Sequence, residues 1–432
     1  MQKTLERALN NVVEVSPREA GAVLWSFAYF FFLLAAYFVL RPLRDEMGVA
    51  AGRDNLQWLF TATFFVMLAV SPLYAWAVAR LPRRRFIPLV YQVFVACLAL
   101  FWLALQHDDW RADTARVFFV WVSVFNLFAV SVFWSFMADL FATRQGKRLF
   151  GFIAAGGTAG TLLGSSITVT LAQTLGTANL LIVAGVMLEV AILCAMGLER
   201  AAEGARDPAQ PAVPQERKTQ IGGGIFDGFA LLARSPYLAG IALWVALLSL
   251  AGTFLYFIQQ DVVRAASADP AVRTQIFAAM DLAANLATLA LQFSATGALV
   301  KRIGAGPAAA ILPLVFAFGF AALVIAPGLI VVVAFQAIQR TANFAFSNPA
   351  REILFTSVHR DEKYKAKNII DTAVFRGGDV AWSWAFTGLR GLAGTYGAAM
   401  VAIPIMLGWL VLALALGRAQ ERAALTIKGE DP

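Results

Sequence analysis

Apolar residues occur along this chain in long runs, and short polar segments separate these runs. A run of about 20 apolar residues is long enough to cross a bilayer as an α-helix. We therefore predict an all-α integral membrane protein with about twelve membrane-spanning helices. Their approximate ranges are 20–40, 56–79, 87–105, 115–138, 149–172, 179–198, 237–259, 275–299, 307–326, 329–348, 367–388 and 396–416.

A pattern of an apolar helix, a basic turn and a further apolar helix with glycines occurs twice. The copies lie at Phe133–Ser166 and Phe346–Ser383, about 210–220 residues apart. Such a repeat is typical of transporters built from two related halves. We predict two six-helix halves, residues 1–198 and 226–432. A polar linker rich in proline and glycine should join them at 199–225.

Composition and charge support a membrane protein and indicate its orientation. Of 432 residues, 59% are hydrophobic and 14% are charged, whereas a soluble domain has about 25% charged residues. The net charge of +8 is distributed over short loops, so it does not indicate nucleic-acid binding. Lys and Arg concentrate in alternate loops, which places both termini and the linker in the cytoplasm. The first apolar run is too long for a signal peptide. We expect a multi-pass protein of the cytoplasmic membrane.

Cysteine and histidine positions do not indicate an enzyme. Cys97 and Cys194 lie within apolar runs, which favours buried thiols over a disulfide or a metal site. His107 and His359 lie in predicted loops, and no metalloprotease or serine hydrolase motif is present. We expect no enzymatic activity, no cofactor and no metal ion.

Glycines recur every four residues in the predicted fifth helix, at Gly156, Gly160 and Gly164. Small residues at this spacing let two helix backbones approach closely in lipid. A phosphate-binding loop would need a lysine and a preceding strand, and neither is present. We therefore predict close helix packing at these glycines.

Polar side chains follow one face of four predicted helices in the second half, at steps of three or four residues. The four stripes are Ser249, Thr253, Tyr256 and Gln260; Asp281, Asn285, Thr288, Gln292 and Thr296; Gln336, Arg340, Asn343 and Ser347; and Thr372, Arg376, Asp379, Ser383 and Thr387. The ninth and twelfth helices lack amide and charged side chains within their spans. We predict that the four striped helices line an aqueous cavity and that the other two face lipid.

Interhelical hydrogen bonding is an alternative explanation for the stripes. It accounts less well for the ionisable residues, because a charge in hydrocarbon costs about 3 kcal/mol.

In the first half, Arg41 and Arg44 end the first helix, where they either reach the headgroups or face the cavity. Glu189, on the sixth helix, lies outside the predicted lining.

Three separated stretches resemble the ATP/ADP translocase (nucleotide transporter) family. FWSFMADLFATRQGKRLFGFIAAGG (133–157) is similar to its FW-x-F … T … KRF … G pattern. YFVLRPLRDEMG (37–48) resembles its first-helix LR-x-x-KD signature. AREILFTSVHRDEKYKAKNIIDTAVFRGGD (350–379) resembles its KE … K-x-K … D … R-x-G segment. The arrangement in two halves is similar to the major facilitator architecture. This resemblance implies exchange of ATP against ADP, with basic residues binding the phosphates.

The charged positions of the family motifs correspond here to Arg44, Asp45, Arg351, Glu352, Lys365, Lys367 and Arg376. Arg44 replaces a lysine, which keeps the charge but changes the geometry. The chain also departs from the family at residues 258–260, which read Ile-Gln-Gln where the family has a glutamate.

We predict a secondary transporter whose halves move alternately around a midplane site. The expected substrate is an organic phosphate anion, with a nucleotide as first choice. The predicted substrate-binding residues are Arg41, Arg44, Asn126, Asp281, Asn285, Arg340, Asn343, Arg376 and Asp379. The predicted gating residues are Asp139, Lys147, Arg148, Glu352, Lys365 and Lys367, where the basic turns should pair with acids such as Asp139 and Glu352.

Two alternatives remain open from the sequence. One is a proton-coupled carrier, or a flippase for another substrate such as an anionic lipid. The other is a membrane assembly factor or sensor that transports nothing, which would leave the polar stripes without a purpose.

Arg340 lies about 16 Å from either membrane face, so it needs a counter-charge from Asp281, Asp379 or the substrate.

Overall fold

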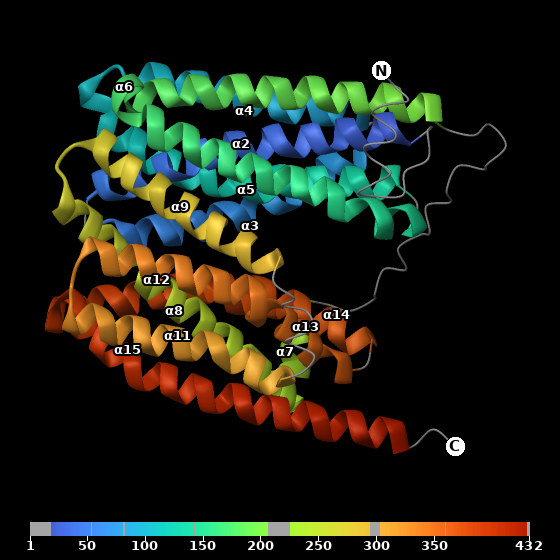
Figure 1. The fold of residues 1–432 in the computed structure, drawn as a ribbon, viewed down its shortest axis with the longest axis vertical. Helices are drawn as coiled ribbons and strands as arrows, with labels where there is room; N and C mark the ends of the chain where they lie inside the picture. The colour runs from blue at the N-terminus through green and yellow to red at the C-terminus, as the bar shows by residue number, and fades with distance from the viewer. Residues whose placement is uncertain are drawn as a thin grey trace. The chain divides into compact units, whose positions relative to one another are not determined.

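The computed structural model describes residues 19–52, 54–80, 83–141, 143–205, 225–293, 303–358 and 360–429. All regular elements within these ranges are helical (Figure 1). Ten helical stretches in the described part of the chain are long and apolar enough to cross a membrane. The predicted all-α membrane fold is therefore confirmed. Most of the predicted linker, at 206–224, and the predicted stripe residue Thr296 lie outside the described residues.

Two of the helices are too long for a single crossing. The helix α6 (Thr143–Ala205) contains 63 residues and α15 (Phe375–Gly429) contains 55. A straight helix of 63 residues would extend about 95 Å, three times the hydrocarbon core of about 30 Å. Gly176 (φ 77°) and Gly394 (φ 75°) interrupt the helical geometry. Glycine adopts this positive φ because it has no Cβ. When the two arms of each kinked helix are counted separately, the described residues contain the twelve apolar segments expected.

The first of two compact units comprises the described parts of 1–52, 65–216 and 267–282. Its core lies among α2 (Ala20–Ala50), α4 (Arg83–Ala104), α5 (Arg111–Leu140) and α6. Aromatic side chains fill this core. Phe30 stacks on Phe133 with ring centroids 4.2 Å apart. The buried Tyr29 hydroxyl donates a hydrogen bond to the Tyr91 hydroxyl at 2.8 Å.

The glycine series of α6 packs directly on the backbone of α2. A Cβ placed on Gly156 would lie 2.6 Å from the carbonyl oxygen of Phe27. Gly160 and Gly164 leave even less space before the carbonyl oxygens of Phe31 and Ala35. No side chain larger than hydrogen fits at these positions without a shift of the helices. The predicted close packing is confirmed.

The second compact unit comprises the described parts of 53–64, 217–266 and 283–432. It contains α7 (Ile225–Arg234), α8 (Pro236–Ala266), α11 (Ala305–Ile325), α12 (Leu329–Ala342), α13 (Asn348–Leu354), α14 (Arg360–Ile369) and α15. The core includes the fully buried Trp244 and Trp409, with ring centroids 5.7 Å apart. Gly306 of α11 contacts Gly417 of α15 backbone to backbone.

Two helices contribute to both units. These are α3 (Leu56–Arg80) and α9 (Pro270–Phe293). The start of α3 belongs to the second unit and its remainder to the first, whereas the start of α9 belongs to the first unit and its end to the second. Each unit is therefore built mainly from one predicted half and includes a short segment of the other.

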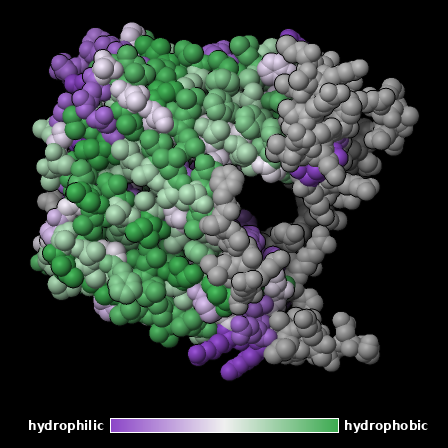
Figure 2. Space-filling view, in the orientation of Figure 1, coloured by the Kyte–Doolittle hydropathy of each residue, from purple (hydrophilic) through white to green (hydrophobic). Residues whose placement is uncertain are grey.

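Large apolar side chains are exposed on many of the helices. Hydrophobic residues cover much of the face shown in Figure 2. On α11, Phe318 and Ile325 are 69% and 83% exposed. On the second arm of α15, Met400, Leu407 and Val411 are exposed. An apolar surface of this kind suits contact with lipid. Because α3 and α4 also expose large apolar side chains, the expectation that the ninth and twelfth helices in particular face lipid stays a prediction.

Candidate functional site

In the first unit, two arginines near the end of α2 form ion pairs within the protein. Arg41 Nη1 lies 3.2 Å from Asp281 Oδ1 of α9, and Arg44 Nη2 donates to Asp45 Oδ1 at 2.6 Å. The side chains of Asp281 and Asp45 are each 5% exposed. The helix continues through Pro42, so both arginines are held by regular α-helix. The structure thus brings together Arg41 and Asp281, two of the predicted substrate-binding residues.

A further buried ion pair involves the last turns of α2. Arg273 Nη2, on α9, donates to Glu46 Oε1 at 2.6 Å, and both side chains are nearly covered. Arg273 Nη1 also donates to the carbonyl oxygens of Ser267 and Ala268. This pair was not predicted from the sequence. The one indication in the sequence of an ion pair at Glu46 was its position close to Arg41 and Arg44.

In the second unit, α8 and the first arm of α15 are joined by a hydrogen bond between predicted stripe residues. The Ser249 hydroxyl donates to Asp379 Oδ1 at 2.6 Å. Asp379 Oδ2 lies 3.9 Å from Arg376 Nη1, which is outside hydrogen-bonding distance. The Arg376 side chain is 45% exposed. The carboxylate is thus held by hydroxyl groups of α8, those of Ser249 and Thr253, and Arg376 is held loosely.

Glutamine side chains connect α8 to α12. Gln336 donates to Gln259, and Gln339 donates to Gln336 Oε1 at 2.6 Å. The neighbouring residue on α8, Gln260, is also buried. Neither its amide nitrogen nor its amide oxygen has a hydrogen-bond partner among the described residues.

Several other buried polar atoms without partners in the described structure also belong to the predicted stripes. They include Asn285 Nδ2, Asn343 Oδ1 and Ser347 Oγ. An unsatisfied buried polar atom costs about 1–3 kcal/mol, and such atoms are few in native proteins. Their occurrence on the stripes is consistent with the prediction that these helix faces line an aqueous cavity, which stays a prediction.

Two π-helical turns interrupt the second unit, one at predicted stripe residues and one within the 350–379 stretch. They are η2 (Asn343–Ser347) and η4 (Ile370–Val374). Such turns are rare and occur frequently at functional sites. A pocket of about 560 Å³ lies beside them, lined by Phe344, Asn348, Pro349, Arg351, Glu352, Lys367 and Asp371.

Two ion pairs join residues that line this pocket. Lys367 Nζ donates to Glu352 Oε1 at 2.5 Å, and Arg351 pairs with Asp371. The second basic turn thus contacts Glu352, the acid named for it from the sequence, whereas the dependence of this pair on an outward-facing cavity stays a prediction. Lys365 lies on the same short helix as Lys367, α14, and is partly buried. The gating role of these residues remains a prediction.

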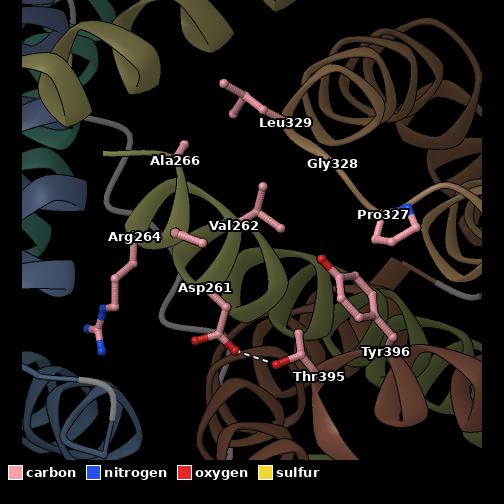
Figure 3. A pocket seen from close by; sticks show the side chains of 10 residues that line it. Asp261, Val262, Arg264, Ala266, Pro327, Gly328, Leu329, Thr395 and Tyr396 are labelled. Carbon is pink, nitrogen blue, oxygen red and sulfur yellow. Dashed lines mark hydrogen bonds between the residues drawn. The ribbon is translucent and has the colours of Figure 1, made fainter. Parts of the chain in front are cut away.

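A second pocket, also of about 560 Å³, lies where α8 ends beside the α11–α12 turn and the kink of α15. Figure 3 shows the Thr395 hydroxyl directed at Asp261, to which it donates at 2.7 Å. Arg390 donates to Asp54 at 3.1 Å and lies 3.6 Å from Asp261. This network was not predicted from the sequence. Arg390 continues the α15 stripe three residues after Thr387, so the same periodicity could have revealed it.

The remaining predicted substrate-binding residues are distributed over both units. Asn126 is partly buried on α5, and Arg340 is partly buried on α12. Asp281 contacts Arg41, and Asp379 contacts Ser249, so the expectation that one of these acids balances Arg340 stays a prediction.

At the first basic turn, Arg148 donates to Glu19 at 2.5 Å, a partner that the sequence did not indicate. The predicted partner Asp139 is exposed near the end of α5. The side chain of Lys147 lies outside the described part of the structure.

Comparison with known proteins identifies the family of this fold. The sequence profile of the Major Facilitator Superfamily matches residues 20–360. None of the curated proteins compared with the chain matches it significantly. Solved structures of similar fold include the nucleoside transporter NupG, at 15% identity over 93% of this chain and 98% of that one, with a TM-score of 0.56.

Two further solved structures share the fold. An auto-inhibited POT family peptide transporter is 12% identical over 93% of this chain and 96% of that one, with a TM-score of 0.61. A bacterial homolog of the human lysosomal transporter Spinster is 15% identical over 93% and 98%, with a TM-score of 0.54. The resemblance to the ATP/ADP translocase family is not confirmed by these comparisons. Because the matching profile spans most of the chain, this protein belongs to the Major Facilitator Superfamily and is a secondary transporter of that type.

Proposed function

We propose that this transporter exchanges organic phosphate anions, with nucleotides as the first candidates, across the cytoplasmic membrane. Arginines within apolar helices support this choice, since a guanidinium group can bind two phosphate oxygens at once. The relevant side chains are Arg41, Arg44, Arg340 and Arg376. The distribution of Lys and Arg over alternate loops supports cytoplasmic termini.

The proposal rests mainly on the position and exposure of the Arg376 side chain. It lies at the start of α15, within a long apolar stretch, where an ionisable group normally faces a water path or a partner. Its ion-pair contact with Asp379 is 3.9 Å long, and the Asp379 carboxylate already accepts a hydrogen bond from Ser249. The exposure of almost half of its side chain supports a role for Arg376 in binding an incoming anion.

The arginines of α2 are held differently. Arg41 and Arg44 lie at 3.2 Å and 2.6 Å from their carboxylate partners and are only 22% and 16% exposed. An anion must compete with Asp281 or Asp45 to reach them. We therefore assign direct contact with the phosphate to Arg376, and assign to Arg41 and Arg44 an indirect electrostatic role.

Uptake of labelled ATP into liposomes that contain the protein and internal ADP tests this function. Wild type should take up ATP saturably. Arg376→Ala should reduce uptake by about 10–100-fold, the loss expected for one or two charge-assisted hydrogen bonds. Arg376→Lys should recover only part of it, because an ammonium group lacks the planar fork.

Arg116→Ala provides the matched control. Arg116 forms an exposed ion pair with Asp113 and should be dispensable for transport. Normal saturable uptake by Arg376→Ala would remove Arg376 from the site. Absence of saturable nucleotide uptake by wild type, with and without internal ADP, would reject the proposed function.

A further inference from the structure

Gln260 is a buried amide that the surrounding protein does not satisfy. It lies on α8 with 4% exposure, and both its nitrogen and its oxygen lack partners among the described residues. Its neighbour Gln259 is equally buried and is hydrogen-bonded to Gln336. The local fold can therefore pair a glutamine, and it leaves this one unpaired. Such an arrangement is unfavourable unless another molecule completes it.

Gln260 lies on the same helix face as Ser249, which contacts a charged residue of the same unit. It ends the α8 stripe that begins at Ser249, the partner of Asp379. Ser249 and Gln260 are 11 residues apart in the sequence, about 16 Å along the helix axis. Tyr256 lies between them, one turn before Gln260, with its ring centroid 5.6 Å from that of Phe60. The stripe thus runs from a charged end, past an aromatic ring, to a neutral amide.

We propose that Gln260 and Tyr256 form a subsite for the nucleobase of the transported nucleotide. A glutamine amide presents donors and an acceptor in one plane and can pair with neighbouring polar atoms at a base edge. An aromatic ring can stack on any base. This subsite rests on the proposed function for the anionic end of the same ligand, which Arg376 binds.

The chemistry of residues 258–260 favours this assignment. The amide at 260 is neutral, so it adds no negative charge beside a phosphorylated ligand. Asn285 and Asn343 each have one buried amide atom without a partner in the described structure, and both belong to predicted stripes of the same unit. They supply further neutral groups for a polar ligand.

Gln260 is covered by protein in this state of the transporter. Under this proposal, a ligand reaches it in another state of the alternating-access cycle. A purely structural amide would behave differently from a ligand-binding one. Gln260→Leu should raise Tm without ligand if the amide is kept for a ligand, because it removes two unsatisfied buried groups. It should lower Tm if the amide stabilises the fold.

Binding by purified wild type, Gln260→Leu and the control Gln106→Leu tests the subsite. The probes are ADP, adenosine and inorganic tripolyphosphate, with Kd measured by calorimetry. Gln260→Leu should weaken ADP and adenosine about tenfold, the effect of one or two lost hydrogen bonds, and leave tripolyphosphate within about twofold. Gln106 is exposed just beyond α4 and donates to the carbonyl oxygen of Trp102, so Gln106→Leu should match wild type.

The outcomes separate this inference from the proposed function. If Gln260→Leu leaves ADP and adenosine unchanged, or weakens all three probes equally, the subsite is wrong and phosphate binding stands. If wild type does not bind tripolyphosphate but Gln260→Leu weakens adenosine, the subsite stands and the anion proposal fails. If wild type binds none of the probes, both fail.

Discussion

Arg41 and Asp281 show what single residues reveal before a structure is known. Asp281 was a functional candidate because charges in hydrocarbon are rare, and Arg41 was one because it ends the first helix at a point where it could face a cavity. Their 3.2 Å contact could not be predicted, since it joins helices far apart in the sequence. The same limit applies to Glu46 and Arg273, whose pairing depends on how α9 packs against α2.

The Arg41–Asp281 pair should stabilise the first unit. Arg41→Ala leaves the Asp281 carboxylate buried without this partner, and we expect a loss of about 3–5 kcal/mol in the free energy of unfolding. Arg41→Ala combined with Asp281→Asn should recover part of this loss, because the negative charge is removed with its partner. Thermal unfolding in detergent measures both effects.

Arg116→Ala serves as the control for this pair. Its partner Asp113 is 80% exposed, so the change should alter stability by at most about 1 kcal/mol. A variant with Arg41→Ala that unfolds at the wild-type temperature would show that the buried pair contributes little.

At the scale of helices, periodic patterns in the sequence predicted which face of a helix packs closely and which face carries polar side chains. The glycine spacing on α6 predicted close packing, which the structure places against α2, and the α8 stripe predicted the face that carries Ser249 and Gln260. The π-helical turns η2 and η4 were not predicted. A π-turn shifts the backbone hydrogen bonds by one residue, and its location depends on packing that no local pattern records.

Replacement of Gly160 tests the contact between α2 and α6. A Cβ at Gly160 meets the backbone of Phe31, so Gly160→Ala should destabilise the protein by about 1–3 kcal/mol. Gly185 lies on the same helix with nothing within 4 Å of an added Cβ. Gly185→Ala should be neutral or slightly stabilising, because alanine favours helix more than glycine does. Equal unfolding temperatures for the two variants would contradict this packing.

For the whole molecule, hydropathy alone predicted the all-helical membrane fold, and the glycines at 176 and 394 reconcile ten continuous stretches in the described residues with twelve expected spans. The sequence did not predict that 53–64 would belong to the second unit and 267–282 to the first. Those assignments follow from contacts such as Arg390–Asp54 and Arg273–Glu46, which form only in the folded chain.

Nucleotide exchange is the activity on which the proposed function depends, and efflux from loaded liposomes measures it. Liposomes containing the protein are loaded with labelled ADP, and release is followed after dilution into buffer with or without unlabelled ATP. Exchange predicts that external ATP accelerates release by at least about tenfold, and that the Arg376→Ala variant loses this acceleration. Release that proceeds at the same rate with and without external ATP would show that the protein is not a nucleotide exchanger.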